Sequence, residues 1–398
     1  MRLKYILSFL FIFNCFFPYI YLIPLQTDSQ PIAFLFSIAL FIFYYKKIDK
    51  DDFVLFILFV ISFVFLLFSN FSFSSFRSFY SYASLFFITF ISYKTLSYLN
   101  GIPYKLFVIT VVIWGIVGFV QLFINPDFCT FLLRGKQGGF GLETGRGVTS
   151  LSTEPSYYGM MCLFFLIILC LNYPYKRKSN WLFFVIMIQL FIFSRSSIAI
   201  LVLMISFIIS AIYKGIKYNI LHLFLLLILI PIFCYVIFSL SIYMPNYRIG
   251  SIILDFMNHP FDLSAFDGSV QERFFHVYFS LYGTIQNCGL PHGFDNFHIV
   301  NQGNFYFLDD LEINYSRIMS AFGGILYELG FFSIMFFSVF LRSVKALIKN
   351  DINNLFYITI LVVILFVGFS FSSSIIPFIL GNIIFLKNRC DKSLIKLK

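Results

Sequence analysis

Charged residues are scarce in this sequence. Of its 398 residues only 12% are charged, whereas 60% are hydrophobic and 22% are aromatic, and the mean hydropathy is +0.90. A soluble domain of this length needs many polar residues on its surface, so this composition excludes that class. Apolar runs of about 20 residues, separated by short polar breaks, indicate an all-α polytopic integral membrane protein.

Several functional motifs are also missing from the sequence. It contains no P-loop, no Rossmann glycine pattern, no GxSxG and no HExxH, so we expect no metal and no cofactor. The two halves show no clear inverted repeat, which weakens a secondary-transporter interpretation. The net charge of +10 does not indicate a nucleic-acid partner, because the basic residues occupy short segments between apolar runs.

The hydropathy predicts about twelve transmembrane helices within a single domain, residues 1–398. If the N-terminus is cytoplasmic, 20 of the 28 basic residues are cytoplasmic, as the positive-inside rule requires, and so is the C-terminus. The predicted spans are 4–24, 28–45, 53–68, 80–98, 104–124, 155–173, 179–193, 196–213, 219–243, 319–341, 355–371 and 373–386.

Two exterior segments are longer than the other connections, residues 125–153 and 244–318. Loops longer than about 15 residues are usually functional or disordered, and the second is too rich in Phe, Ile and Tyr for disorder. Seven of the eight exterior basic residues are Arg, whose planar fork binds phosphate in a bidentate manner. The exterior set therefore indicates a phosphate-bearing ligand, although loop packing and snorkelling also explain individual members. The eight are Arg77, Arg134, Lys136, Arg146, Arg195, Arg248, Arg273 and Arg317.

The stretch GRGVTSLSTEPSYYGMM (145–161) places Arg146 and Glu154 just before an apolar run. Arg146 follows a glycine-rich stretch in which backbone can approach a ligand closely. Glu154 is a candidate base, but it can equally be the cap of the helix that begins at Pro155. Tyr157 and Tyr158 are candidates for stacking on a sugar ring or a prenyl chain.

Two further ionisable residues lie within or at the edge of apolar runs. Arg195, in the FSRSS turn (193–197), is expected at or slightly below the outer membrane boundary, facing a polar cavity or snorkelling outward. Glu328 lies in the middle of the tenth predicted span. It is expected to pair with an Arg or line a cavity, or else to be protonated and structural.

The long exterior segment contains a predicted helix near 270–285. Helical spacing puts Arg273, His276, Ser280 and Thr284 on one stripe, with aromatic and aliphatic residues around it. We expect this polar face to be turned toward a cavity, the alternative being a stripe that faces solvent.

The turn NCGLPHGFDNFH (287–298) follows this helix. It brings Gly293, Asp295 and His298 together with His292. Histidines in loops are most often structural, so a catalytic role for His298 is an alternative rather than the first expectation.

These segments resemble one family, the bacterial O-antigen polymerases (Wzy-type) within the O-antigen polymerase and ligase group. RGVTSLSTEPSYYG resembles the family's Arg-then-Glu-Pro entry to a span, and SRSSIAILVL its Ser/Arg turn. QERFFH with GLPHGFDNF resembles the Arg helix and glycine turn of its large periplasmic loop, and AFGGILYELGFFSI the span after it. The four motifs lie in the expected order across roughly residues 145–335.

The resemblance implies a GT-C-like, metal-independent, inverting glycosyltransferase in the bacterial inner membrane. Its substrates would be undecaprenyl-pyrophosphate-linked oligosaccharides at the periplasmic face, and its partners would be membrane lipid and a chain-length regulator protein. Catalytic roles are expected for Glu154, Arg146, Arg273, His298 and Asp295. Substrate binding is expected of Arg195, Arg317, Tyr157, Tyr158, His276, Glu328 and Gly293.

Two other functions remain open at this point. An O-antigen ligase shares the fold and the chemistry, and His298 or His276 fits its acceptor step. A lipid-linked oligosaccharide flippase also has about twelve spans, but its charges should follow a path within the spans. Here the charges cluster in two exterior loops, which favours an enzyme.

Overall fold

The computed structural model describes residues 2–24, 27–134, 147–173, 180–218, 268–297 and 318–396. Within these ranges every regular element is a helix and there is no β-strand. The helices are α1 (Arg2–Phe16), α2 (Ile32–Tyr44), α3 (Lys50–Phe68), α4 (Phe73–Leu99), α5 (Tyr104–Phe123), η1 (Thr130–Leu132), α7 (Pro155–Asn172), α8 (Asn180–Ile188), the π-helical turn η3 (Gln189–Ser194), α9 (Ser197–Tyr218), α12 (Gly268–Gln286), α13 (Ala321–Leu329), η6 (Gly330–Phe332), α14 (Ser333–Asn350), α15 (Asn354–Val367) and α16 (Ile375–Lys396).

Five stretches of helix are long and apolar enough to cross a membrane. Large apolar side chains such as Phe63, Ile116 and Phe207 lie exposed on their outer surfaces, as expected of helices that face lipid. The described chain therefore has the character of an all-helical protein embedded in a membrane. The five are Lys50–Phe68, Tyr104–Phe123, Pro155–Asn172, Ser197–Lys217 and Ala321–Asn350.

Several helices begin at the residues that local chemistry favours. Ser72 is the N-cap of α4 and accepts a hydrogen bond from the N–H of Ser75, at 3.1 Å. Ser320 does the same for α13, accepting from the N–H of Gly323 at 2.9 Å. Pro155 occupies the first turn of α7, where its missing N–H costs nothing.

Several predicted spans differ from the observed helices. The fourth was expected at 80–98 and the twelfth at 373–386, but α4 begins at Phe73 and α16 continues to Lys396. The first was expected at 4–24, but α1 ends at Phe16, because Pro18 cannot continue a helix. The tenth was expected as one helix over 319–341, but it breaks at η6. Gly330 has a φ of +54° there, and a Cβ on it would lie 2.5 Å from the carbonyl oxygen of Gly289. The ninth span, 219–243, lies outside the described residues.

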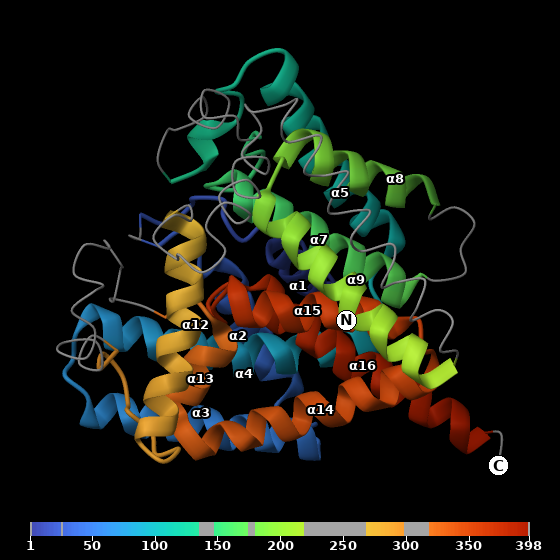
Figure 1. Ribbon diagram of the computed structural model, residues 1–398. Coiled ribbons are helices and arrows are strands. Elements are labelled where there is room, and N and C mark those ends of the chain that lie inside the picture. The colour runs from blue at the N-terminus through green and yellow to red at the C-terminus, as the bar shows by residue number, and fades with distance from the viewer. Residues whose placement is uncertain are drawn as a thin grey trace.

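The centre of the bundle is the packing of α16 against α4, and α3 also packs on α4 (Figure 1). α7 and α9 pack on α15, and α12 runs steeply beside α13. At the α4–α16 contact, Gly381 lies so close to α4 that a Cβ on it would be 2.5 Å from both the Ser92 Cβ and the Thr89 carbonyl oxygen.

Gly381→Val is expected to destabilise the protein by at least 1–3 kcal/mol, about the usual cost of overpacking, because a backbone oxygen cannot move aside easily. Gly324→Ala is the matched control, since its Cβ would be 3.9 Å from the nearest side chain. Thermal unfolding of the detergent-purified protein measures both. Equal melting temperatures for the two variants would contradict the observed closeness of α4 and α16.

A cluster of ion pairs ties α3, α4, α14 and α16 together at one end. The Lys94 ammonium lies 2.7 Å from Asp49 and 2.8 Å from Asp52. Asp51 pairs with Lys387 at 2.6 Å and with Arg342 at 3.1 Å. All six residues belong to segments that the sequence predicts to be cytoplasmic or at that boundary, so the fold gathers those segments at one end.

Candidate functional site

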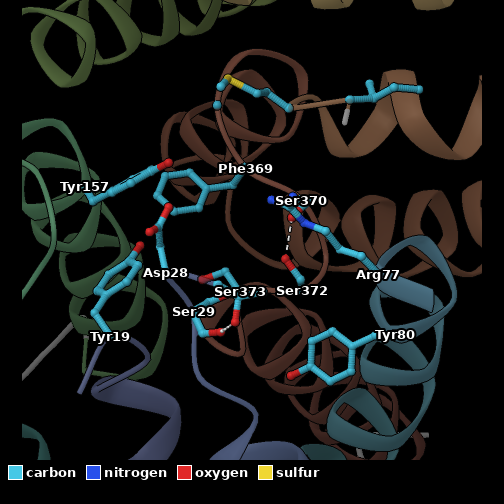
Figure 2. Close-up of a pocket in the computed structure, with 14 residues that line it drawn as sticks. Tyr19, Asp28, Ser29, Arg77, Tyr80, Tyr157, Phe369, Ser370, Ser372 and Ser373 are labelled. Carbon is cyan, nitrogen blue, oxygen red and sulfur yellow. Dashed lines mark hydrogen bonds between the residues drawn. The ribbon is translucent and has the colours of Figure 1, made fainter. Parts of the chain in front are cut away.

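A polar cavity lies at the opposite end of α4 from this ion-pair cluster. From Arg77 to Lys94 the helix rises about 25 Å, at 1.5 Å per residue. The cavity has about 640 Å³ of empty space. Its lining, drawn in Figure 2, consists of Tyr19, Thr27, Asp28, Ser29, Arg77, Tyr80, Tyr157, Ile318, Met319, Gly368, Phe369, Ser370, Ser372 and Ser373.

Every segment of this lining lies at the predicted exterior ends of the spans. The segments are the connection before α2, the start of α4, the start of α7, the residues before α13 and the α15–α16 connection. They are far apart in sequence, so only the fold brings them together. A ligand in this cavity would be approached from the predicted exterior face.

The lining is rich in hydroxyl groups. The Tyr19 and Ser373 hydroxyls are buried and lie within reach of each other, with no other hydrogen-bond partner among the residues that the structure describes. Asp28 and Glu154 both lie within electrostatic range of the Tyr19 hydroxyl, and Figure 2 places the Asp28 side chain beside it. A buried wall of hydroxyl groups suits a polar ligand that can form hydrogen bonds with it.

Arg273 brings a buried positive charge to the same place. Its side chain comes from α12 and is only 8% exposed. Its Nη1 lies close to Gly368, which lines the cavity. A Cβ built on Gly368 would be 3.2 Å from Nη1. Nη1 has no hydrogen-bond partner among the described residues. Burying a guanidinium nitrogen without a partner costs free energy of folding, and binding an anion would offset that cost.

The polar stripe of α12 faces the protein interior, as expected, and not solvent. His276 and Ser280 are fully buried, whereas Phe274 and Tyr278 are exposed. His276 is linked to the cavity through Met319, whose N–H donates to its Nδ1 at 3.4 Å. Its Nε2 lies 3.8 Å from the Glu272 carboxylate.

A second cavity, with about 480 Å³ of empty space, adjoins the first. Arg77, Ile318 and Ser370 line both. Glu328 lies in its wall and accepts hydrogen bonds from Ser78 Oγ, at 2.6 Å, and Tyr82 Oη, at 2.5 Å. The expectation that Glu328 lines a cavity is met. Both of its carboxylate oxygens accept hydrogen bonds from these hydroxyls. The partners of Glu328 are therefore hydroxyl groups of α4 and not the Arg that was the other expectation.

The turn after α12 fastens the end of α13 to the start of α4. Gly293, with a φ of +74°, donates its N–H to the Glu328 carbonyl at 3.0 Å. Asp295 accepts a hydrogen bond from Ser72 Oγ at 2.7 Å. Gly293 and Asp295 were expected in the site itself. Their observed contacts instead hold together the elements that form the second cavity.

The other described candidates divide into near and distant groups. Tyr157 lines the first cavity, stacked on Tyr19 with ring centroids 5.5 Å apart. Glu154 is exposed at the N-cap of α7 without a side-chain cap bond, beside the cavity rather than in its lining. Tyr158 was expected to stack on a ligand, but it is fully buried and donates to Gln189 at 3.0 Å, because it packs between α5 and η3.

Arg195 lines neither cavity. It ends η3 with a φ of +44°, and its Nε donates to the Ile192 carbonyl at 3.2 Å. Gly147 packs directly against the backbone of Phe193 and Ser194, the two residues that precede Arg195. Arg146, His298 and Arg317 lie outside the described residues.

The sequence reasoning did not assign several residues that line the first cavity. The sequence does contain a signal for two segments of the lining. Hydroxyl residues cluster in SFSSFRSFYSYAS (72–84) and in FSFSSS (369–374), in a chain that is otherwise mostly apolar. Ser74, Arg77, Ser78 and Ser81 recur at helical spacing on one side of α4. Asp28 had no such signal, since it lies in a short exterior turn.

A larger hollow, with about 1050 Å³ of empty space, lies near Tyr173 and Asp351, at the ends that the sequence predicts to be cytoplasmic. Its described lining includes Asp351, Asn353 and Asn354, and the Lys214 ammonium donates to Asn353 at 3.0 Å. No protein-family model and no curated protein matches this chain.

Proposed function

We propose that this protein is an O-antigen polymerase of the Wzy type, a glycosyltransferase that joins undecaprenyl-pyrophosphate-linked repeat units. The observation that carries the proposal is Arg273, a buried guanidinium beside a hydroxyl-lined cavity, one nitrogen of which has no partner among the described residues. Hydroxyl and aromatic side chains suit a sugar, and a guanidinium suits a pyrophosphate. One cavity thus provides for both parts of such a substrate.

In the proposed reaction a hydroxyl oxygen of one repeat unit attacks the anomeric carbon of the other glycan. A new carbon–oxygen bond forms as the bond to pyrophosphate breaks, and the leaving undecaprenyl pyrophosphate takes the electron pair. The hydroxyl proton passes to a base, for which Glu154, beside the cavity, is the first candidate and His298, outside the described residues, is the alternative. Arg273 would stabilise the charge that develops on the leaving group, and Arg146, which lies outside the described residues, is a candidate to assist it.

The proposal includes a twelve-span, GT-C-like architecture in the bacterial inner membrane, with both termini in the cytoplasm. Two observations support this orientation. The cavity collects segments predicted to be periplasmic, and the ion pairs of Lys94, Lys387 and Arg342 collect segments predicted to be cytoplasmic. A lipid-linked substrate flipped to the outer face would then meet the cavity directly.

The test is a lipopolysaccharide gel from a strain in which this gene is deleted. We expect a lipid A core that carries a single repeat unit, because flipping and ligation continue when polymerisation is lost. A bare core with long polymer on undecaprenyl pyrophosphate would identify a ligase instead. A bare core with single units retained on the cytoplasmic side would identify a flippase and overturn the proposal.

A further inference from the structure

Arg77 occupies the junction of the two cavities. It lies near the start of α4 and lines both the first and the second cavity, as do Ile318 and Ser370. Figure 2 shows its side chain reaching from α4 toward Ser370, across the cavity. Of the residues shared by both cavities, it is the one that carries a charge.

The helical turns that carry Arg77 are held in place from two directions. On one side, Ser72 donates to Asp295 of the turn after α12. On the other, Ser78 and Tyr82 donate to Glu328 of α13. These contacts fix the start of α4 against α13, so the position of Arg77 is set before any ligand arrives, as preorganised binding requires.

A second guanidinium approaches the same segment of chain. Arg273 Nη1 lies beside Gly368, and Arg77 reaches toward Ser370, two residues further along. Two fixed positive charges from different helices beside one polar wall suit a ligand with more than one negative charge. A diphosphate fits this description better than a single carboxylate.

We infer that Arg77 binds the pyrophosphate of the lipid-linked substrate at the junction of the two cavities, an assignment that rests on the proposed function. A transfer reaction must bring two ligands together, and the leaving group lies next to the bond that breaks. A residue that lines both cavities lies where a ligand in one cavity would meet a ligand in the other. Arg77 is thus a substrate-binding residue in the predicted exterior turn between the third and fourth spans, well before the two long exterior loops.

The test uses full-length protein in nanodiscs, with undecaprenyl pyrophosphate and uncharged undecaprenol as the two probes. Wild-type protein is expected to prefer the pyrophosphate lipid. Arg77→Ala is expected to reduce affinity for it at least tenfold and to leave undecaprenol binding unchanged. Arg77→Lys, which keeps the charge but loses the fork, is expected to fall between the two. Arg342→Lys, at the other end of the bundle, is the matched control and should bind both probes as wild type does.

The possible results separate this inference from the proposed function. If Arg77→Ala and Arg77→Lys retain the full preference for the pyrophosphate lipid, the role of Arg77 is overturned and the polymerase proposal stands. If wild-type protein binds the two probes equally, the cavity does not recognise pyrophosphate and both are overturned. A variant that loses undecaprenol binding as well has lost its fold, and Arg77→Lys then decides the question.

Discussion

Replacing Arg273 with alanine is expected to reduce polymer synthesis by about two to three orders of magnitude, the usual effect of removing one group that stabilises transition-state charge. Nη1 forms no hydrogen bond with the described residues, so its removal breaks none there, and the amount of variant protein in the membrane checks that it is folded. The measurement is polymer length and amount on a lipopolysaccharide gel, with the variant expressed in the deletion strain.

Two controls make this result specific. Arg273→Lys keeps the positive charge but not the two-pronged donor, so it should also lose most activity if pyrophosphate is bound in a bidentate manner. Arg342→Ala removes an exposed Arg at the other end and should leave the polymer unchanged. Normal polymer in Arg273→Ala, at wild-type protein levels in the membrane, would remove Arg273 from the site.

Lys94→Met is expected to destabilise the protein by about 3–5 kcal/mol, the usual cost of breaking a buried ion pair by removing one partner. Lys94 is 7% exposed and Asp52 is 1% exposed, so the substitution leaves the Asp52 carboxylate buried without its counter-ion. Thermal unfolding of the purified protein, or its recovery from membranes, measures the effect.

The control for Lys94 lies in the same cluster. Arg342→Met removes one of the two partners of Asp51, and Lys387 remains. The Arg342 side chain is 53% exposed, and an exposed pair contributes at most about 1 kcal/mol. The double variant Lys94→Met with Asp52→Asn should recover part of the lost stability, because the neutral amide no longer needs a counter-ion. If Lys94→Met proves as mild as Arg342→Met, the Lys94–Asp52 pair is not a stabilising feature of the fold.

The sequence predicted well those features that depend on local chemistry. Pro155 and the apolar run after it indicated a helix at 155–173, and α7 covers Pro155–Asn172. The spacing of Arg273, His276 and Ser280 predicted a helix with one polar face, and α12 buries that face. Such signals can be read from sequence because helical periodicity and proline act over a few residues.

Helix breaks were less predictable. The apolar run through Leu329 and Phe331 has no local reason to stop, so one span was expected there. The break at Gly330 arises because the Gly289–Pro291 backbone, some 40 positions earlier in the chain, packs against that glycine. Contacts between distant segments leave no periodic trace in either segment.

The composition of this protein alone determined that its helices belong in a membrane, because so few charged residues cannot cover a soluble domain. The order of Lys-rich and Arg-bearing segments also predicted which helix ends lie together. Only the tertiary structure decided which polar residues share a cavity. Asp28, Arg77, Tyr157 and Ser370 meet there because α4, α7, α15 and α16 pack side by side, and packing of this kind depends on side-chain shape across the whole bundle rather than on any local pattern.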